Sequence, residues 1–349
     1  MILYKHKAFL ITTAMLAVVF IGFAGCKKKN NLPHPDISNI VVDLHFERME
    51  KPFMRADGGN YRQVLDSMQE QYPDFFQLLT NDILNMRSYN DSTYRIYDTL
   101  YHYMIADAYM LRLYDSVAAL YTDISDVEQE LETALRYYKY YFPDSLIPGF
   151  YTYVAPFVYQ VVISDEVLAV ELNMFMGKNF TYYSAFAANM PQYLLYRFDR
   201  SYMVVSIMRA LMDGSIPDKG ADANLLDEMI KEGKMMYYLD CMLPDAPDSV
   251  KIGFHTTQLD WCADNEADIW RFFAGEELFF STRNQDKQRY IGEAPNAFGM
   301  PEGAPGRIGV WVGWQVVRKY MEQHPETTLA ELFAITDGTT LLKGSGYKP

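Results

Sequence analysis

The sequence has few cysteines, and Cys26, Cys241 and Cys262 are the only three among its 349 residues. A fold held together by disulfide bonds needs a denser supply of cysteine in a chain of this length, so we exclude a disulfide scaffold. A single bridge between Cys241 and Cys262 stays open at this point.

Histidine is almost as scarce, and its spacing excludes the common zinc-peptidase motif. The six histidines are His6, His34, His45, His102, His255 and His324. No two of them are four residues apart, whereas H-E-x-x-H places two zinc ligands one helical turn apart, with the glutamate as base. A catalytic zinc ion needs three protein ligands and an open position. We therefore expect no metal, no cofactor-binding residue and no catalytic residue. A metal site assembled from distant residues such as His255, Asp264 and Glu266 is the alternative.

Motifs of other enzyme classes are missing as well. The chain has no G-x-S-x-G elbow of serine hydrolases, no P-loop and no G-x-G-x-x-G dinucleotide-binding pattern. No unit of about 20 to 50 residues recurs, which excludes a solenoid of repeats.

Positive charge is in the minority, since 31 lysines and arginines stand against 45 aspartates and glutamates, for a net charge of −14. Binding to nucleic acid needs a basic surface, so we exclude nucleic acid as a partner. Hydrophobic residues make up 50% of the chain and charged residues 22%. This is the balance of an ordinary globular protein, and the chain is long enough to bury a large core.

The N-terminus predicts a lipid anchor. Lys5 and Lys7 precede an apolar run over residues 8–23, and "FAGC" then ends at Cys26, directly before "KKKNN". This pattern is typical of a lipoprotein signal peptide. We expect residues 1–25 to be removed and Cys26 to carry a diacylglycerol and an N-acyl chain such as palmitate, which would hold the protein on a membrane. The alternatives are an uncleaved membrane helix, for which the run is short, and plain secretion after loss of Cys26.

After the anchor, we predict a polar tether over residues 26–35 and one globular domain over residues 36–349. Alternation of apolar and polar residues from Ile40 to Glu47 predicts a strand, and the β-branched and aromatic runs over 149–177 predict two or three more, including an antiparallel pair. Helical periodicity covers 61–79 (broken near Pro73), 93–121, 127–142, 202–212, 223–242, 257–280 and 307–323. The predicted fold class is α+β, mainly α-helical, with a small antiparallel sheet.

Two of these helices contain the candidate site residues. The segment "LLDEMIKEGKMMYYLD" includes Glu232 and Gly233, and many zinc peptidases take their third metal ligand from a glutamate in this setting. The helix before it, residues 201–214, is built from Met, Ile, Val and Ala, which do not bind zinc. A buried carboxylate without a metal needs another partner, and we expect Lys234 or Arg209 to supply it.

The segment "PGRIGVWVGW" contains the other candidate. Gly309 and Gly313 lie near one face of a helix, where small residues allow close packing. Arg307 stands at the start of this helix, where exposed N–H groups attract anions. It is a candidate anion-binding or interaction site.

Six segments, in the same order, carry a resemblance to a known family. They are "DEVLAVELNMFMGKNFTYY" (165–183), "MPQYLLYRF" (190–198), "EMIKEGKMMYYLD" (228–240), "LDWCADNEADIWRFF" (259–273), "APGRIGVWVGWQVVRKYM" (304–321) and "SGYKP" (345–349). They resemble the gliding motility lipoprotein GldB family, and "YPDFF" (72–76) is a weaker match. The resemblance implies a cell-envelope lipoprotein whose partners are gliding or type IX secretion proteins.

The resemblance also bears on the metal site. GldB-like proteins are similar to predicted HExxH zinc peptidases, and the comparison assigns Glu232-Gly233 to the ligand-bearing Glu-Gly and residues 201–214 to the HExxH helix. Both histidines and the base are missing here, so the resemblance implies a degenerate zincin-like scaffold, a pseudoenzyme. Surface lipoproteins of such bacteria often have acidic residues after the lipidated cysteine. The basic "KKKNN" therefore favours an outer-membrane anchor with the domain facing the periplasm.

Three functions follow as hypotheses. The first is a membrane-anchored, non-catalytic scaffold or interaction component of the cell envelope. The second is an anchored hydrolase with an unconventional metal site, for example around Asp264, Glu266, Glu276 and Glu277. The third is a glycan- or peptide-binding lipoprotein that uses Trp261, Trp270, Trp311 and Trp314.

Overall fold

The computed structural model describes residues 34–86, 93–186 and 191–349, and His34–Pro349 forms one compact unit. The predicted signal peptide, the lipidation site Cys26 and most of the tether lie outside the described residues. In the part of the chain that is described, no helix is both long and apolar enough to cross a bilayer.

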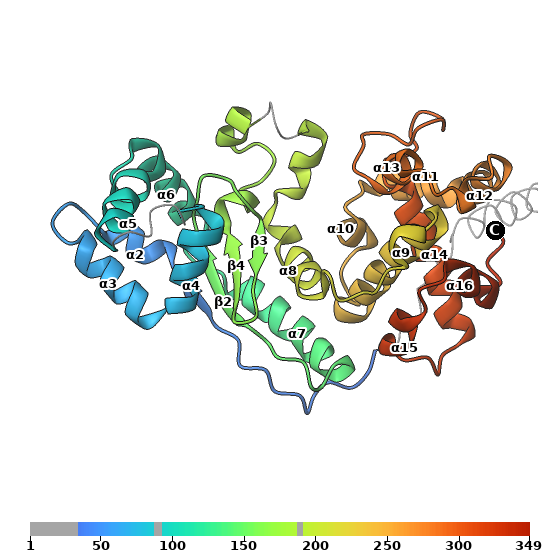
Figure 1. Cartoon of the computed structure of the whole chain (residues 1–349), viewed down its shortest axis with the longest axis horizontal. Helices are drawn as coiled ribbons and strands as arrows, with labels where there is room; N and C mark the ends of the chain where they lie inside the picture. Colours follow the sequence, from blue (N-terminus) through green and yellow to red (C-terminus); the bar gives the residue numbers. More distant parts are fainter. Residues whose placement is uncertain (1–33, 87–92, 187–190) are drawn as a thin grey trace, which may run out of the picture. The chain divides into compact units, whose positions relative to one another are not determined.

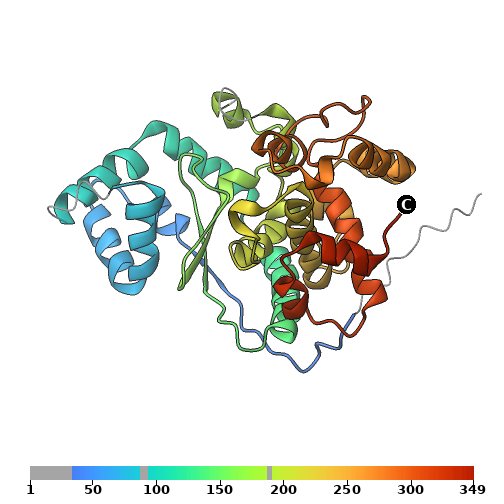
Figure 2. The ribbon, with the colours of Figure 1, turned by 45° about the vertical axis from the view of Figure 1, so that its right-hand side comes forward.

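A four-stranded sheet with the strand order β1-β2-β4-β3 has helices on both sides (Figures 1 and 2). Its strands are β1 (Phe46–Arg48), β2 (Gly149–Tyr153), β3 (Val161–Ile163) and β4 (Val167–Glu171). Helix α4 contacts β4, and α8 contacts β3. All five residues of β4 are buried, as expected for a strand with neighbours at both edges and helices over its faces.

The sheet is mixed, which corrects the prediction of an antiparallel sheet. Strands β3 and β4 are antiparallel, as predicted for a hairpin with a short turn, but β1, β2 and β4 run parallel. The reason is that helices connect β1 to β2, and a long connection can return the chain in the same direction.

The predicted strand over 40–47 is wrong in extent, because β1 begins only at Phe46. Residues 40–45 do alternate between exposed and half-buried. However, no described strand pairs with them, so the alternation alone does not make a strand.

The helices before β2 largely follow the predicted periods. They are α2 (Glu50–Arg55), α3 (Tyr61–Gln71), α4 (Pro73–Gln77), the π-helical η2 (Leu78–Ile83), α5 (Thr93–Leu100), the π-helical η4 (Tyr101–Ile105), α6 (Ala108–Leu120) and α7 (Ser125–Tyr141). The break near Pro73 is confirmed. The predicted helix over 93–121 is interrupted before α6, where the Asp107 carboxylate accepts hydrogen bonds from the backbone N–H groups of Tyr109 and Met110. Asp107 is an N-cap residue.

Short 3-10 helices lead from the sheet into the C-terminal half. They are η5 (Leu172–Phe175), η6 (Thr181–Phe186), η7 (Gln192–Arg197), η8 (Arg200–Tyr202) and, after α8, η9 (Gly220–Asp222). The remaining helices are α8 (Met203–Met212), α9 (Leu225–Met242), α10 (Asp248–Ile252), α11 (Thr256–Asp264), α12 (Glu266–Gly275), η10 (Leu278–Phe280), α13 (Asn284–Ile291), α14 (Ile308–Gln323), α15 (Leu329–Ala334) and α16 (Gly338–Ser345).

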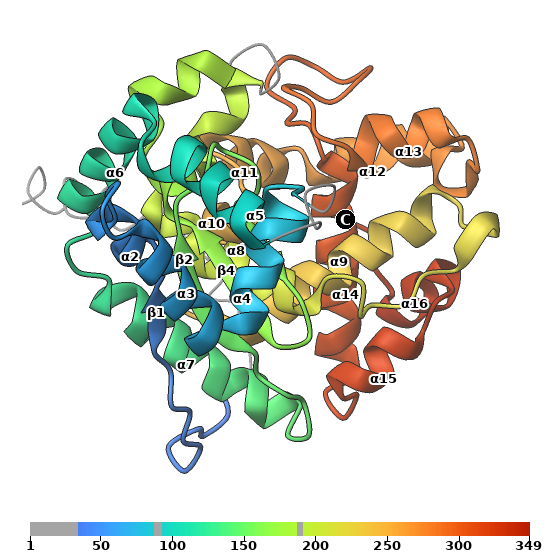
Figure 3. The same cartoon turned by 60° about the vertical axis from the view of Figure 1, so that its left-hand side comes forward.

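Helices α9 and α14 pack directly on each other, with α16 against both (Figure 3). Their backbones touch at two glycines. A Cβ atom at Gly233 would lie 2.3 Å from the carbonyl carbon of Gly313, and one at Gly313 would lie 1.7 Å from the carbonyl oxygen of Met229. The close packing predicted for Gly309 and Gly313 is confirmed, since a Cβ atom at Gly309 would lie 2.9 Å from the carbonyl oxygen of Tyr290. Gly233 has the same structural role.

Cys241 on α9 and Cys262 on α11 do not form a disulfide bond with each other, since both are buried as free thiols. Burial raises the pKa of each thiol to about 12. Both therefore behave as small apolar side chains.

Candidate functional site

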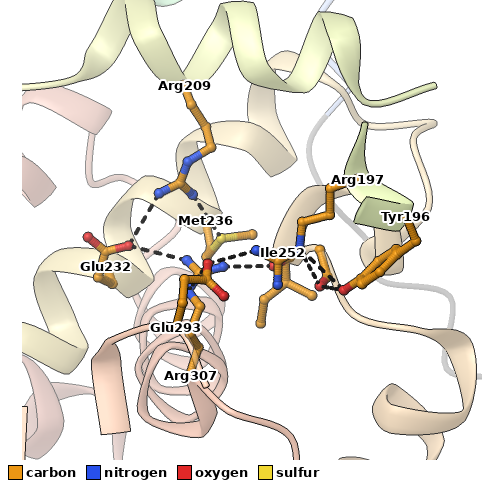
Figure 4. Close-up of polar contacts among 9 residues, drawn as sticks. Tyr196, Arg197, Arg209, Glu232, Met236, Ile252, Glu293 and Arg307 are labelled. Carbon is orange, nitrogen blue, oxygen red and sulfur yellow. Dashed lines mark hydrogen bonds and ion pairs between the residues drawn. The ribbon is translucent and has the colours of Figure 1, made fainter. Parts of the chain in front are cut away.

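Glu232 lies on α9 directly before Gly233, where two arginines approach its carboxylate (Figure 4). Its Oε2 atom is 3.3 Å from Nη2 of Arg209 on α8 and 3.7 Å from Nη2 of Arg307. The predicted pairing of Glu232 with Arg209 is therefore confirmed. Arg209 also donates to the sulfur of Met236, which lies one turn after Glu232.

Lys234, the other predicted partner of Glu232, points elsewhere. Two residues along an α-helix turn the side-chain direction by about 200°, so Lys234 faces away from Glu232. Its ammonium group donates to the carbonyl oxygens of Phe333 and Ile335 at the end of α15. Burial lowers the pKa of Lys234 to about 8.

Arg307 precedes α14 in a left-handed backbone conformation, with φ 58°. Its side chain is only 11% exposed, and its guanidinium donates to the Ile252 carbonyl at 3.0 Å. Nε of Arg307 also lies 3.5 Å from Oε1 of Glu293. Burial and the neighbouring Arg209 lower the pKa of Arg307 to about 10. Arg307 is thus an inner member of an ion-pair cluster, and anion binding at this residue stays a prediction.

Arg197, on η7, completes this cluster. It donates to Oε1 of Glu293 at 2.7 Å and to the carbonyl oxygen of Gly253 at 3.0 Å. Gly253 has φ 71°, and a Cβ atom there would lie 2.5 Å from Nε of Arg197. Only glycine adopts this positive φ at little cost and also leaves room for the side chain of Arg197. We call Arg197, Arg209, Glu232, Glu293 and Arg307 the arginine cluster; it has three cations and two anions.

A pocket of about 340 Å³ adjoins the arginine cluster. Five separate stretches of the chain line it, within 178–179, 192–197, 254–258, 294–295 and 305–306, and its polar lining includes Lys178, Gln192, Arg197, His255 and Gln258. Lys178 is exposed and forms no ion pair with any described residue. The His255 ring lies against the Tyr196 ring, with the ring centroids 4.0 Å apart and the planes tilted by 33°. The Tyr196 hydroxyl donates to the Gly253 carbonyl. Pro305 and Gly306 form another wall, directly before Arg307.

The residues around Glu232 do not fit a zinc ion. Across residues 34–86, 93–186 and 191–349, no group of three or more His, Cys, Asp or Glu side chains is placed to hold a metal. His255, Asp264 and Glu266, the residues of the alternative site, lie within these ranges and form no such group. In addition, two guanidinium groups within 4 Å of the carboxylate would repel a divalent cation.

The other predicted candidates lie apart from the arginine cluster. Asp264, Glu276 and Glu277 are exposed, and Glu266 accepts a hydrogen bond from the Tyr347 hydroxyl at 2.6 Å.

The four tryptophans do not share one exposed face. Trp311 and Trp314 are core residues, 5% and 0% exposed. Trp261 and Trp270 are half-buried, and Trp270 packs against Phe279 and Tyr347.

Sequence reasoning missed a second buried ionic network, centred on Asp240 of α9. This fully buried carboxylate accepts hydrogen bonds from Trp314 at 2.8 Å, Arg318 at 2.7 Å and Lys251 at 3.0 Å. Arg318 also binds Asp248 at 2.8 Å. The network joins α9, α10 and α14. An aspartate within the otherwise apolar end of a predicted helix is the signal that could have revealed it.

The fold and the site define a mainly helical α+β protein in which arginines neutralise a central glutamate. Residues 30–349 match the family described as gliding motility protein GldB, so the chain belongs to the GldB family of gliding motility lipoproteins. The predicted resemblance is confirmed and extends beyond the C-terminal segments on which it was based. A search of curated proteins and a search of solved structures gave no match. The relation to zinc peptidases stays a prediction.

Proposed function

We propose that this GldB-family protein is a membrane-anchored, non-catalytic component of the cell envelope that acts by binding other proteins of the gliding or type IX secretion machinery. Membership in a gliding motility lipoprotein family supports the setting. The pairing of Glu232 with Arg209 and Arg307 is the observation that carries the non-catalytic role.

The reasoning starts from the helix before Glu232. A zinc peptidase would present histidines there, but α8 consists of Met, Val, Ser, Ile, Arg, Ala and Leu residues. Its Arg209 places a fixed positive charge where a metal would have to lie. The carboxylate of Glu232 then acts as a structural counter-ion, which a glutamate among buried helices requires.

The anchor and the location are part of the same proposal. Lipid on Cys26 would tether the domain through the residues before His34, and the basic residues Lys27, Lys28 and Lys29 favour a periplasm-facing outer-membrane anchor. A tethered domain of this kind meets its partners in two dimensions, which raises their effective concentration.

Elemental analysis of the untagged full-length protein, dialysed against metal-free buffer, tests the non-catalytic role. We expect far less than about one equivalent of zinc, because a site with a single carboxylate and two guanidiniums lacks the three ligands that zinc requires. About one equivalent of zinc that is lost in Glu232→Ala, together with peptide hydrolysis, would overturn the proposal.

A further inference from the structure

The pocket beside the arginine cluster has a charge opposite to that of the whole chain. The chain has a net charge of −14, yet the charged residues that line the pocket are Lys178 and Arg197, and no described aspartate or glutamate is among the lining residues. A concave basic site attracts anions locally, even on an acidic protein.

The two cationic side chains that line the pocket differ in how firmly their positions are fixed. Lys178 lies in the loop between η5 and η6, is exposed and forms no ion pair within the described part of the chain. Arg197 is fixed by Glu293 and the Gly253 carbonyl, and its side chain is 20% exposed. One cation is therefore preorganised, and the other is free to close on a ligand.

The arginine cluster behind the pocket is short of negative charge. Its two carboxylates, Glu232 and Glu293, form ion pairs with three guanidinium groups. By this count the cluster has one positive charge more than its carboxylates supply, and Arg307, the most buried of the three arginines, lies between both carboxylates. A buried excess of one charge is unfavourable unless a counter-ion approaches.

The rest of the lining suits a polypeptide. Gln192 and Gln258 offer amide donors and acceptors for a peptide backbone, while Phe254 and Pro295 offer apolar contact. Glu293, paired with Arg197 beside the pocket, adds repulsion that a dianionic phosphate would feel more strongly than a monoanionic carboxylate.

We propose that this pocket binds a carboxylate group of a partner polypeptide, with Lys178 and Arg197 as its anchors. The proposal rests on the binding role proposed above and identifies the chemistry that the pocket recognises. The carboxylate belongs either to the C-terminus of the partner or to an acidic side chain.

Three acetylated tetrapeptides distinguish these sources in ligand-observed NMR titrations of the full-length protein in a neutral detergent. One is Ser-Ala-Ser-Ala with a free C-terminus, the second is the same peptide amidated, and the third is Ser-Ala-Glu-Ala amidated. We expect saturable binding of at least one carboxylate peptide and binding of the neutral peptide that is about tenfold weaker or undetectable. The tighter carboxylate peptide identifies the source.

Two charge reversals test the site. Lys178→Glu should weaken carboxylate binding by about tenfold or more. Lys51→Glu is the matched control, because Lys51 is also exposed and free of ion pairs with described residues but lies on α2. It should leave binding unchanged. Since Lys178 is exposed, its substitution leaves the fold intact, and circular dichroism of both variants verifies this.

Three results would overturn the proposal: equal binding of the neutral and acidic peptides, equal effects of Lys178→Glu and Lys51→Glu, or displacement by inorganic phosphate at concentrations where acetate has no effect. Mass spectrometry of the peptides after titration separates this proposal from the previous one. Cleaved peptides with carboxylate-dependent binding would refute the non-catalytic role and keep the pocket. Intact peptides without such binding would refute the pocket alone.

Discussion

At the scale of single residues, Glu232 shows how a residue in a motif acquires its role from its neighbours. In zinc peptidases a glutamate carboxylate beside two histidines binds the metal, whereas the carboxylate of Glu232 pairs with Arg209 and Arg307. Its chemistry is unchanged, and the charges around it decide its function.

A double-mutant cycle on Glu232→Gln and Arg209→Gln tests this role. We expect a coupling of about 1 kcal/mol in the free energy of unfolding, because the two half-buried side chains interact directly. Urea denaturation measures it. The same cycle with Lys231→Gln is the control, since Lys231 pairs with Asp218 instead. Equal couplings in the two cycles would contradict a specific pair between Glu232 and Arg209.

Another residue-scale prediction concerns Glu171, the last residue of β4. Its buried carboxylate accepts hydrogen bonds from the backbone N–H groups of Phe157, Val158 and Tyr159 and from Asn173. Burial outweighs these bonds and raises the pKa of Glu171 from 4.5 to about 7. The folded protein therefore holds this proton more tightly than the unfolded chain does.

The sign follows from proton linkage. Between pH 4.5 and about 7, this group lowers the stability as the pH rises, by up to about 3 kcal/mol at 1.36 kcal/mol per pKa unit. Urea denaturation at pH 5 and at pH 8 measures the effect as the difference between the wild type and Glu171→Gln. The wild type should lose stability relative to Glu171→Gln as the pH rises. An unchanged difference would show that Glu171 titrates as it does in the unfolded chain.

At the scale of elements, the crossing of α9 and α14 organises the C-terminal half. The crossing is close because Gly233 and Gly313 have no side chains there, and the Asp240 network joins the same two helices farther along. The Glu-Gly pair thus combines an ion-pair residue with a packing residue. This structural role accounts for Gly233 without any metal.

Substitution of one glycine tests the crossing. Gly233→Ala should destabilise the protein by about 3 kcal/mol or more, because the new methyl group would overlap the backbone of α14. Gly275→Ala is the matched control at the end of α12, where a Cβ atom meets nothing within 4 Å. It should stabilise the protein slightly, as alanine favours helix. Thermal melts of the two variants compare them directly, and similar melting temperatures would refute the packing argument.

At the scale of the whole molecule, the protein combines one compact unit over His34–Pro349 with a predicted lipid anchor before it. Its net negative charge disfavours contact with anionic surfaces in general. The pocket and the lysines after Cys26 are positively charged regions on this acidic chain. Such a distribution suits a tethered domain that binds selected partners.

Removal of the lipidation site tests the tether. Cys26→Ser should move the protein from the membrane fraction to the supernatant after cell lysis, because each buried acyl methylene contributes about 0.8 kcal/mol to membrane affinity. Fractionation followed by immunoblotting measures the shift. Cys262→Ser is a control that keeps the anchor. Retention of Cys26→Ser on membranes would show that the apolar run over 8–23 or a partner holds the protein instead.

Part of this fold and site was predictable from the sequence. Side-chain periodicity is local, so the main helices and the antiparallel pair of strands were found, including the break at Pro73. The parallel pairing of β1 with β2 was not predictable, because Phe46 and Phe150 come together only after a long helical connection. Arg209 could be proposed as a partner of Glu232, but Arg307 could not.

The sequence by itself determined the likeness to the GldB family, the absence of an HExxH motif and the helical periods, because each depends on residues that are close along the chain. Only the tertiary structure decided that Arg307 faces Glu232, that Asp240 meets Arg318, and that five separate stretches of the chain line a basic pocket. The physical reason is that ion pairs and pockets depend on how helices cross. Helix crossing is set by the packing of residues far apart in the sequence, such as the close approach of Gly233 and Gly313. No local sequence pattern predicts it.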